Sequence, residues 1–336
     1  MSGKPSQADS AKNPMYPVSE KKILIPGVYT ADPSAHVING RLVVFCSHDN
    51  PNSTRPEDDL GNHFDMIDYR IMRFSEDMAF VEDMGIVLPI AEIPWARRQL
   101  WAPDATFVNG RCYFYFPAKD SNGIFRIGVA TSPSPYGPFR AEANHIPGSF
   151  SIDPAVFVDD DGQGYLYFGG DMGGQLHLWP KNRYSKHTRR KTAGSAMKSR
   201  VARLTRDMLG FEGPAMKMIV NDNKGRKLRA GDMDRRFFEG SWVHKYNGTY
   251  YFSYSTGETH KIVYATSASP VGPWEYRGVI LSPPIGWTTH HSIVEYMNNW
   301  YLFYHDATLS GKTHLRNVKM QRLHYNSDGT IRPMDP

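Results

Sequence analysis

Residues 31–49 read ADPSAHVINGRLVVFCSHD. A small or acidic start leads into an alternating run, an Asn-Gly pair, and a second run rich in Val and Phe. Alternation of apolar and polar residues is typical of a half-buried β-strand. Asn-Gly between two such runs predicts a two-residue hairpin turn, because both residues tolerate left-handed backbone. The segment therefore predicts two antiparallel strands joined by a tight turn.

The same pattern returns four more times along the chain. The further copies are APDATFVNGRCYFYFPAKD at 102–120, IDPAVFVDDDGQGYLYFGGD at 152–171, EGSWVHKYNGTYYFSYSTG at 239–257 and HHSIVEYMNNWYLFYHD at 290–306. The expected turns are Asn39-Gly40, Asn109-Gly110, Asp161-Gly162, Asn247-Gly248 and the weaker Asn298-Asn299. Third strands follow some hairpins, as in the runs that begin at 125 and 261. Five units of three or four strands predict an all-β fold, a five-bladed β-propeller, with a β-sandwich as the alternative.

One propeller accounts for nearly the whole chain. We expect a polar N-terminal segment over 1–24 and a single catalytic propeller domain over 25–336. Extra length at 49–66 and 179–236 is predicted to form loops on blades one and three.

The composition is that of an ordinary globular protein, with 40% hydrophobic and 22% charged residues among 336. No run approaches the roughly 18 apolar residues of a membrane-spanning helix, so no membrane association is expected. The start of the chain lacks the apolar core of a secretory leader, so we expect a cytoplasmic protein. The sequence leaves the oligomeric state open.

The net charge is +5, from 39 Lys and Arg against 34 Asp and Glu. Most of the excess lies in 181–206, which holds ten Lys and Arg and no acid. This segment is either a solvated loop or a patch for polyanions or acidic glycans; no nucleic-acid partner is expected. Cys46 and Cys112 stand in apolar runs and are expected to be buried free thiols.

Three carboxylates stand at equivalent places in three copies: Asp32, Asp153 and Glu239. The first strand of each blade lines the central channel of a propeller, so these side chains are expected to converge there. Each alone has a structural explanation, since Asp before Pro starts turns and Glu before Gly ends loops. Clustered acids repel one another, so three together favour a function. Hydrolysis of a glycosidic bond uses such a set, with one acid to protonate the leaving oxygen and one carboxylate to activate water or attack the sugar.

Six separated motifs then resemble glycoside hydrolase family 43 over about 25–333. They are ADPSAH, WAPD, SIDPAVF, EGSW, HHSIV and RNVKMQRLHYNSDGTI. The resemblance implies an inverting mechanism with Asp32 as general base, Asp153 as the residue that tunes and orients the acid, and Glu239 as general acid. Inversion in turn implies a base-to-acid separation of roughly 6.5–9.5 Å.

The resemblance also suggests further site residues. Trp101 looks like the aromatic that flanks the sugar, with a core tryptophan as the alternative. Arg316 looks like the arginine that reaches substrate hydroxyls, with an arginine on a solvated strand face as the alternative. His290 matches a histidine near a central Ca²⁺ whose other ligands are mostly water, or is a channel histidine bonded to a carboxylate; Thr289 replaces the family's usual Gly. His291 is the remaining candidate for substrate binding. Asp104 is expected to be structural.

Within the family, the runs around 100–132 look most like β-xylosidases that also remove α-L-arabinofuranose. We expect an oligosaccharide substrate and exo-acting release of D-xylose, with endo-arabinanase activity as a more distant alternative. Retaining fructan hydrolases are a poorer match, because their WMNDPNG and EC motifs are absent. A non-catalytic glycan-binding propeller stays open as a different class.

Overall fold

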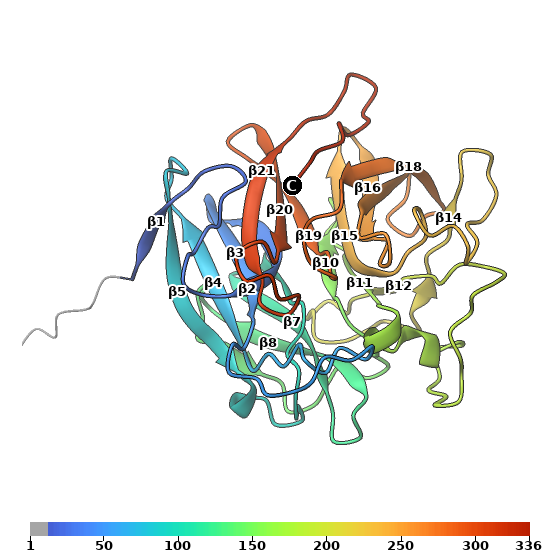
Figure 1. Cartoon of the computed structure of the whole chain (residues 1–336), viewed down its shortest axis with the longest axis horizontal. Helices are drawn as coiled ribbons and strands as arrows, with labels where there is room; N and C mark the ends of the chain where they lie inside the picture. The colour runs from blue at the N-terminus through green and yellow to red at the C-terminus, as the bar shows by residue number, and fades with distance from the viewer. Residues whose placement is uncertain (1–12) are drawn as a thin grey trace, which may run out of the picture.

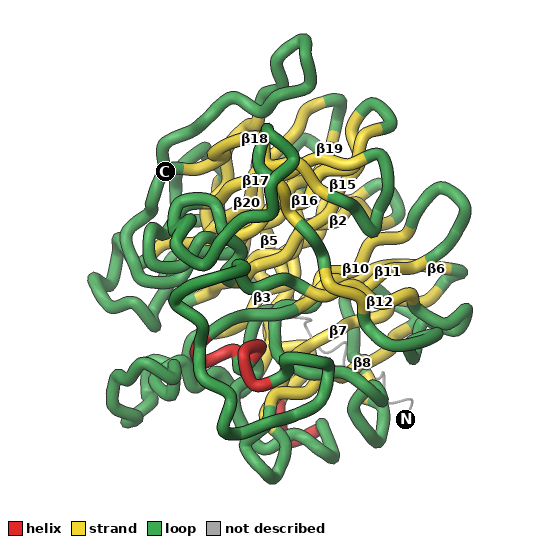
Figure 2. The backbone as a smooth tube through the Cα atoms, turned by 90° about the vertical axis from the view of Figure 1, so that its right-hand side faces the viewer, coloured by secondary structure: helices red, strands yellow, loops and turns green. Residues whose placement is uncertain are grey.

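The computed structural model describes residues 13–336, and these form five sheets around a central axis (Figure 1). All strand pairs among them are antiparallel except one short parallel pair at the outer edge of the fourth sheet. Helical structure in this range is confined to three short 3-10 segments (Figure 2): η1 (Ile90–Glu92), η2 (Met172–Gly174) and η3 (Leu176–Leu178). No helix among these residues is long and apolar enough to cross a membrane. The predicted all-β five-bladed propeller is confirmed.

The blades follow one another along the chain. Blade one holds β2 (Thr30–Ile38), β3 (Arg41–His48), β4 (Asp68–Phe74), β5 (Phe80–Pro89) and the edge strand β1 (Met15–Pro17). Blade two holds β6 (Asp104–Val108), β7 (Arg111–Lys119), β8 (Phe125–Ser132) and β9 (Arg140–Ala141). Blade three holds β10 (Ala155–Val158), β11 (Gly164–Phe168), β12 (Arg200–Arg203) and β13 (Met216–Lys217). Blade four holds β15 (Glu239–Tyr246), β16 (Thr249–Ser255), β17 (Ile262–Ser267), β18 (Trp274–Leu281) and β14 (Val220–Asn221), and blade five holds β19 (His291–Tyr296), β20 (Asn299–Asp306) and β21 (Asn317–Leu323).

The turn residues determine where the hairpins bend. Asn39-Gly40, Asn109-Gly110 and Asn247-Gly248 all have positive φ at both positions, as a type I′ turn requires. In blade three the loop is longer, and Asp159 N–H donates to the Gln163 carbonyl (3.0 Å). In blade five the turn is formed by Met297 and Asn298, with φ of 52° and 58°, not by Asn298-Asn299. The prediction there was wrong by one residue, because Asn takes left-handed backbone at either place.

The ring closes between blades five and one. The inner strand β2 contacts β19, and the two blades lie side by side in Figure 1. Residues before 25 contribute to this closure, since Lys21 N–H donates to the Met320 carbonyl (2.8 Å) and Leu24 N–H to the Val318 carbonyl (3.0 Å). The boundary expected at 24/25 is therefore not a structural one: β1 extends blade one, and the residues after it pair with β21.

Aromatic and branched side chains fill the space between blades. Phe45 of β3 and Phe114 of β7 lie 5.6 Å apart between their ring centroids, which joins blades one and two. Each such aromatic side chain buries a large apolar area, so these contacts between blades stabilise the propeller. Cys46 and Cys112 are buried free thiols, as predicted. The expected loops at 49–66 and across most of 179–236 are also present, although the latter range contains the short strands β12, β13 and β14.

Candidate active site

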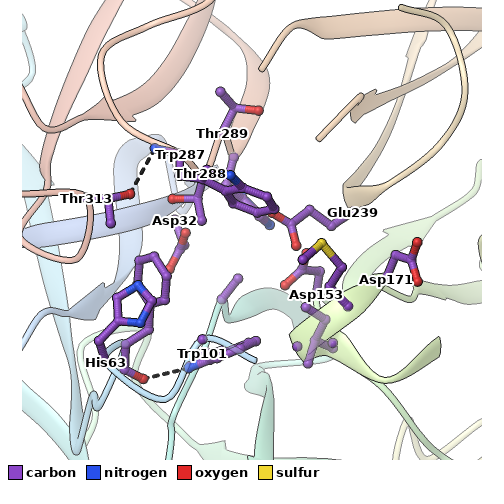
Figure 3. Close-up of a pocket in the computed structure, with 18 of the residues that line it drawn as sticks. Asp32, His63, Trp101, Asp153, Asp171, Glu239, Trp287, Thr288, Thr289 and Thr313 are labelled. Atoms are coloured by element: carbon purple, nitrogen blue, oxygen red, sulfur yellow. Dashed lines mark hydrogen bonds between the residues drawn. The ribbon is translucent and has the colours of Figure 1, made fainter. Parts of the chain in front are cut away.

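The three predicted carboxylates line one pocket of about 360 Å³ at the end of the central channel (Figure 3). Asp32 lies on one side, and Glu239 and Asp153 lie on the other. The two aspartates are only 5% and 4% exposed. The volume is in the range of small-ligand sites. The central sequence prediction, that residues far apart in the chain meet in one hollow, is confirmed.

Backbone irregularity turns these side chains into the channel. Asp32 and Asp153 have φ of 54° and 55°, a left-handed conformation that Asp adopts more readily than most residues. In blade four the left-handed residue is Gly240, one position after Glu239, with φ of 69°. The strand register shifts at Ala31/Ser34 in blade one and at Glu239/Trp242 in blade four. Bulges of this kind re-aim side chains, and here they present carboxyl groups to the pocket.

Asp32 is held as a carboxylate by Arg316. The Nη1 atom of Arg316 lies 3.0 Å from Oδ1 of Asp32, and Nη2 lies 3.3 Å from Oδ2. Asp49 fixes the guanidinium from the other side, at 2.7 Å from Nη2 and 3.0 Å from Nε. Burial alone would raise the pKa of Asp32, but the Arg316 charge and smaller contributions lower it to about 2. Asp32 is therefore ionised at neutral pH.

Two further groups hold Asp32 in place. Its backbone N–H donates to Nδ1 of His305 (3.0 Å), and the Ser47 hydroxyl donates to its carboxylate. The Nδ1 atom also lies 3.4 Å from Asp32 Oδ1, but this contact is not an ion pair. Nδ1 accepts a hydrogen bond, and burial together with the Arg316 charge lowers the pKa of His305 to about 3, so the ring is neutral.

Asp153 and Glu239 favour a single shared proton. Burial and the negative charge of Asp32 raise the pKa of Asp153. Burial, followed by the charges of Asp153 and Asp32, raises the pKa of Glu239 well above its usual value. Gly240 N–H donates to Oδ2 of Asp153 (2.8 Å), which stabilises the charged form of Asp153. No residue of 13–336 donates to the Glu239 carboxyl, so the proton belongs on Glu239.

Trp101 forms one wall of the pocket. Its Nε1–H donates to the Phe64 carbonyl (2.8 Å), which satisfies the only polar atom of the indole. The ring packs on Phe125, with 4.6 Å between centroids. It is partly exposed and lines the pocket, so it offers an apolar surface for a sugar. Sugar contact by Trp101 stays a prediction.

The other predicted residues take different places. Arg316 lines the pocket, but its donors face Asp32, Asp49 and Thr288, and its expected contact with substrate stays a prediction. His290 lines the pocket, as a residue near an ion would. His291 does not: it is fully buried, and its Nε2 pairs with the Ser253 hydroxyl at 2.6 Å. Adjacent strand residues point to opposite faces, so only one of the two histidines reaches the channel.

Asp104 is structural, as expected. Its carboxylate accepts the backbone N–H groups of Val156 (2.6 Å) and Ala105 (2.7 Å), and His36 Nε2 donates to it at 2.6 Å. Because Val156 belongs to β10 and Asp104 to β6, this carboxylate ties blades two and three together.

Several pocket residues were not marked by the sequence patterns. His63 and Phe64 come from the long loop after β3, and Trp287 and Thr288 come from the segment before β19. Trp287 packs edge-on against Phe238, with 5.6 Å between ring centroids. Two signals were available: the extra length at 49–66, since insertions often carry binding residues, and a tryptophan shortly before the fifth copy.

A five-bladed propeller with an ionised and a protonated carboxyl in one central pocket is the arrangement of a glycosidase. Comparison with known proteins agrees. The profile of glycosyl hydrolases family 43 matches residues 60–331. The chain is 51% identical to a xylosidase/arabinosidase of Bacteroides ovatus, over 93% of this chain and 97% of the relative, and 46% identical to a β-xylosidase of Xylanibacter ruminicola, over 93% and 98%.

A solved structure is also closely similar. It is a GH43 β-xylosidase/α-arabinofuranosidase from a compost microbial metagenome, in complex with xylotriose and in a calcium-free form. It superposes with a TM-score of 0.92 at 52% identity, over 95% of this chain and 98% of that one. The chain belongs to glycosyl hydrolases family 43, as the motifs suggested.

Proposed function

We propose that this protein is an inverting, exo-acting glycosidase that releases terminal β-D-xylose, and also α-L-arabinofuranose, from xylooligosaccharides or arabinoxylan side chains. The observation that carries the proposal is the contrast between Asp32, which is held ionised by Arg316, and Glu239, which retains a proton. A base and an acid with separated pKa values in one pocket match the needs of glycoside hydrolysis.

The reaction follows from these protonation states. Asp32 takes a proton from a water that attacks the anomeric carbon, and the new carbon–oxygen bond forms on one face of the sugar. Glu239 gives its proton to the leaving oxygen as the glycosidic bond breaks on the other face. Asp153 keeps that proton on Glu239 by repulsion and is itself oriented by Gly240 N–H. Configuration at the anomeric carbon inverts, and solvent exchange restores the starting protonation.

Closure of the pocket on one side supports exo action. The loop of blade one reaches across to η2 of blade three, where a Cβ on Gly173 would lie 2.6 Å from the Leu60 carbonyl oxygen and 3.1 Å from the ring of Trp101. A polysaccharide cannot continue through such a contact. The pocket therefore suits the end of a chain, and the substrates of the relatives support a pentose there.

His290 fits a role as a single protein ligand for Ca²⁺. Both of its ring nitrogens are buried and have no hydrogen-bond partner within 13–336, and burial lowers its pKa, so the ring is neutral. No group of three or more His, Cys, Asp or Glu in that range is arranged to hold a metal. Calcium prefers oxygen ligands, so His290 would hold the ion together with water. When bound, the ion would supply positive charge that offsets the pocket carboxylates.

Hydrolysis of p-nitrophenyl β-D-xyloside and p-nitrophenyl α-L-arabinofuranoside by the purified protein tests the proposal. We expect turnover of both, faster with the xyloside, and release of xylose from the end of xylooligosaccharides. Sugar binding without turnover of either substrate would favour a glycan-binding protein instead. Faster internal cleavage of arabinan would contradict exo action.

A further inference from the structure

A closed ring of contacts surrounds Phe238, the residue before the acid Glu239. Asp171 N–H donates to the Phe238 carbonyl (3.0 Å), and the Asp171 carboxylate accepts from Nε of Arg190 (2.7 Å). Nη2 of Arg190 also donates to Glu258 (3.0 Å). Glu258 in turn accepts from Arg236 (2.7 Å), two residues before Phe238. Four charged side chains therefore link Asp171, whose N–H bonds the Phe238 carbonyl, to Arg236 on the same strand-leading segment as Phe238.

The phenyl ring of Phe238 is enclosed by the same groups. The guanidinium carbons of Arg190 and Arg236 lie 5.9 and 6.0 Å from its centroid. The Asp171 and Arg236 side chains are 4% and 7% exposed, while those of Arg190 and Glu258 are about one third exposed. Charge pairs buried to this extent are screened less than surface pairs, so the network is able to fix a backbone position.

The orientation of the Glu239 side chain is set by the residues around it. No hydrogen-bond donor within 13–336 holds its carboxyl, so its direction follows from the backbone at the start of β15 and from packing. Packing is tight there, since a Cβ on Gly170 would lie 3.2 Å from the Glu239 Cβ. Asp171 follows Gly170 in the chain, and its side chain lies beside Glu239 and Asp153 (Figure 3). Movement of Asp171 or Phe238 would therefore move Glu239.

Arg190 belongs to the basic segment 181–206, which supplies none of the three pocket carboxylates. Its neighbour Arg189 is exposed and makes no side-chain hydrogen bond or ion pair among the described residues. Arg190 therefore contacts the pocket-lining residues Asp171 and Phe238, whereas the adjacent Arg189 faces solvent.

We propose that Arg190 is a positioning residue that holds Asp171 and Glu258 around Phe238 and thereby directs the Glu239 carboxyl toward the leaving oxygen. The inference rests on the proposed function, because it assumes that Glu239 donates a proton. The basic segment 181–206 then serves catalysis through one of its arginines.

The test compares leaving groups. A p-nitrophenol leaves with little help from an acid, whereas the sugar alcohol released from xylobiose needs a proton. In Arg190→Met we expect kcat/KM for xylobiose to fall about tenfold or more, and for p-nitrophenyl β-D-xyloside by less than about threefold. Arg190→Lys keeps the charge but cannot bond Asp171 and Glu258 at the same time, as the guanidinium does. We expect an intermediate loss of kcat/KM for xylobiose in this variant. Arg189→Met is the matched control and should equal the wild type on both substrates.

Loss of the same size on both substrates, or no loss on either, overturns the inference. If Arg190→Met does not fold, Asp171→Asn tests the same point, since it removes the charge that Arg190 holds while keeping the side-chain shape; the same selective loss is expected. A wild type that cleaves neither xylosides nor arabinofuranosides would instead refute the proposed function. The two failures are therefore distinguishable.

Discussion

Replacement of Arg316 by Met should shift the acidic limb of the pH–rate profile to higher pH. The guanidinium lies 3.0 Å from Asp32 Oδ1 in a buried site, and two unit charges about 4 Å apart at an effective dielectric constant of about 20 attract by about 4 kcal/mol. At about 1.4 kcal/mol per pH unit, loss of that attraction corresponds to about three pH units. The pKa of Asp32 is lowered in the wild type, so its charge is present above that pKa and is lost as pH falls through it. In the variant, Asp32 loses its charge at a higher pH. The enzyme therefore loses its general base at that higher pH.

The substitution also leaves Asp49 buried without its partner. Removal of one member of a buried pair costs roughly 3–5 kcal/mol of stability. The double variant Arg316→Met with Asp49→Asn avoids that orphaned charge and is the matched control for folding. We would measure kcat/KM from pH 4 to 9 and thermal unfolding for the wild type and both variants. The limb should move in both variants, and most of the lost stability should return in the double variant.

An unchanged acidic limb with a raised KM would show that Arg316 does not lower the pKa of Asp32. That outcome would assign Arg316 to substrate hydroxyls, as the sequence resemblance suggested, and not to the charge of Asp32.

Three further outcomes are expected. Glu239→Gln should lower kcat on xylobiose by about 10²–10⁴-fold while the affinity for xylobiose is largely kept. Steady-state kinetics measure the first quantity and calorimetry the second; an unchanged kcat or a large loss of affinity would contradict the role of Glu239 as acid. Gly173→Ala should lower kcat/KM at least several-fold by displacing the loop above Trp101, whereas Gly213→Ala, where a Cβ meets nothing within 4 Å, should not; equal behaviour of the two would count against a closed pocket. Calcium should bind the wild type weakly, with a Kd near or above about 10⁻⁴ M by calorimetry, and not bind His290→Ala; retained binding in that variant would place the ion elsewhere.

The blades could be predicted because their information is local. An Asn-Gly pair, an alternating run and a small residue at the start of a strand stand within twenty residues of one another. The convergence of Asp32, Asp153 and Glu239 followed from that periodicity, since equivalent positions of a propeller face one channel. The error at Met297-Asn298 arose where the turn lacks the Gly that would have marked its position.

The electrostatics of the site could not be predicted, because they depend on contacts between distant residues. Arg316 lies 284 residues from Asp32, and nothing near either position indicates the pair. The same holds for His305, which accepts the Asp32 N–H, and for Arg190, which looks like any other cation of its segment. Pocket residues on loops, such as Phe64 and Trp287, follow no strand period, so the repeat pattern did not mark them.

The stereochemical course of the reaction decides whether Asp32 acts as a base and Glu239 as an acid. A base and an acid on opposite sides of the pocket deliver water to the face opposite the leaving group. Proton NMR of the first product from a β-D-xyloside, recorded before mutarotation, should therefore show α-D-xylose. If β-D-xylose appears first, one carboxylate attacks the sugar directly, and the roles assigned to Asp32 and Glu239 are wrong.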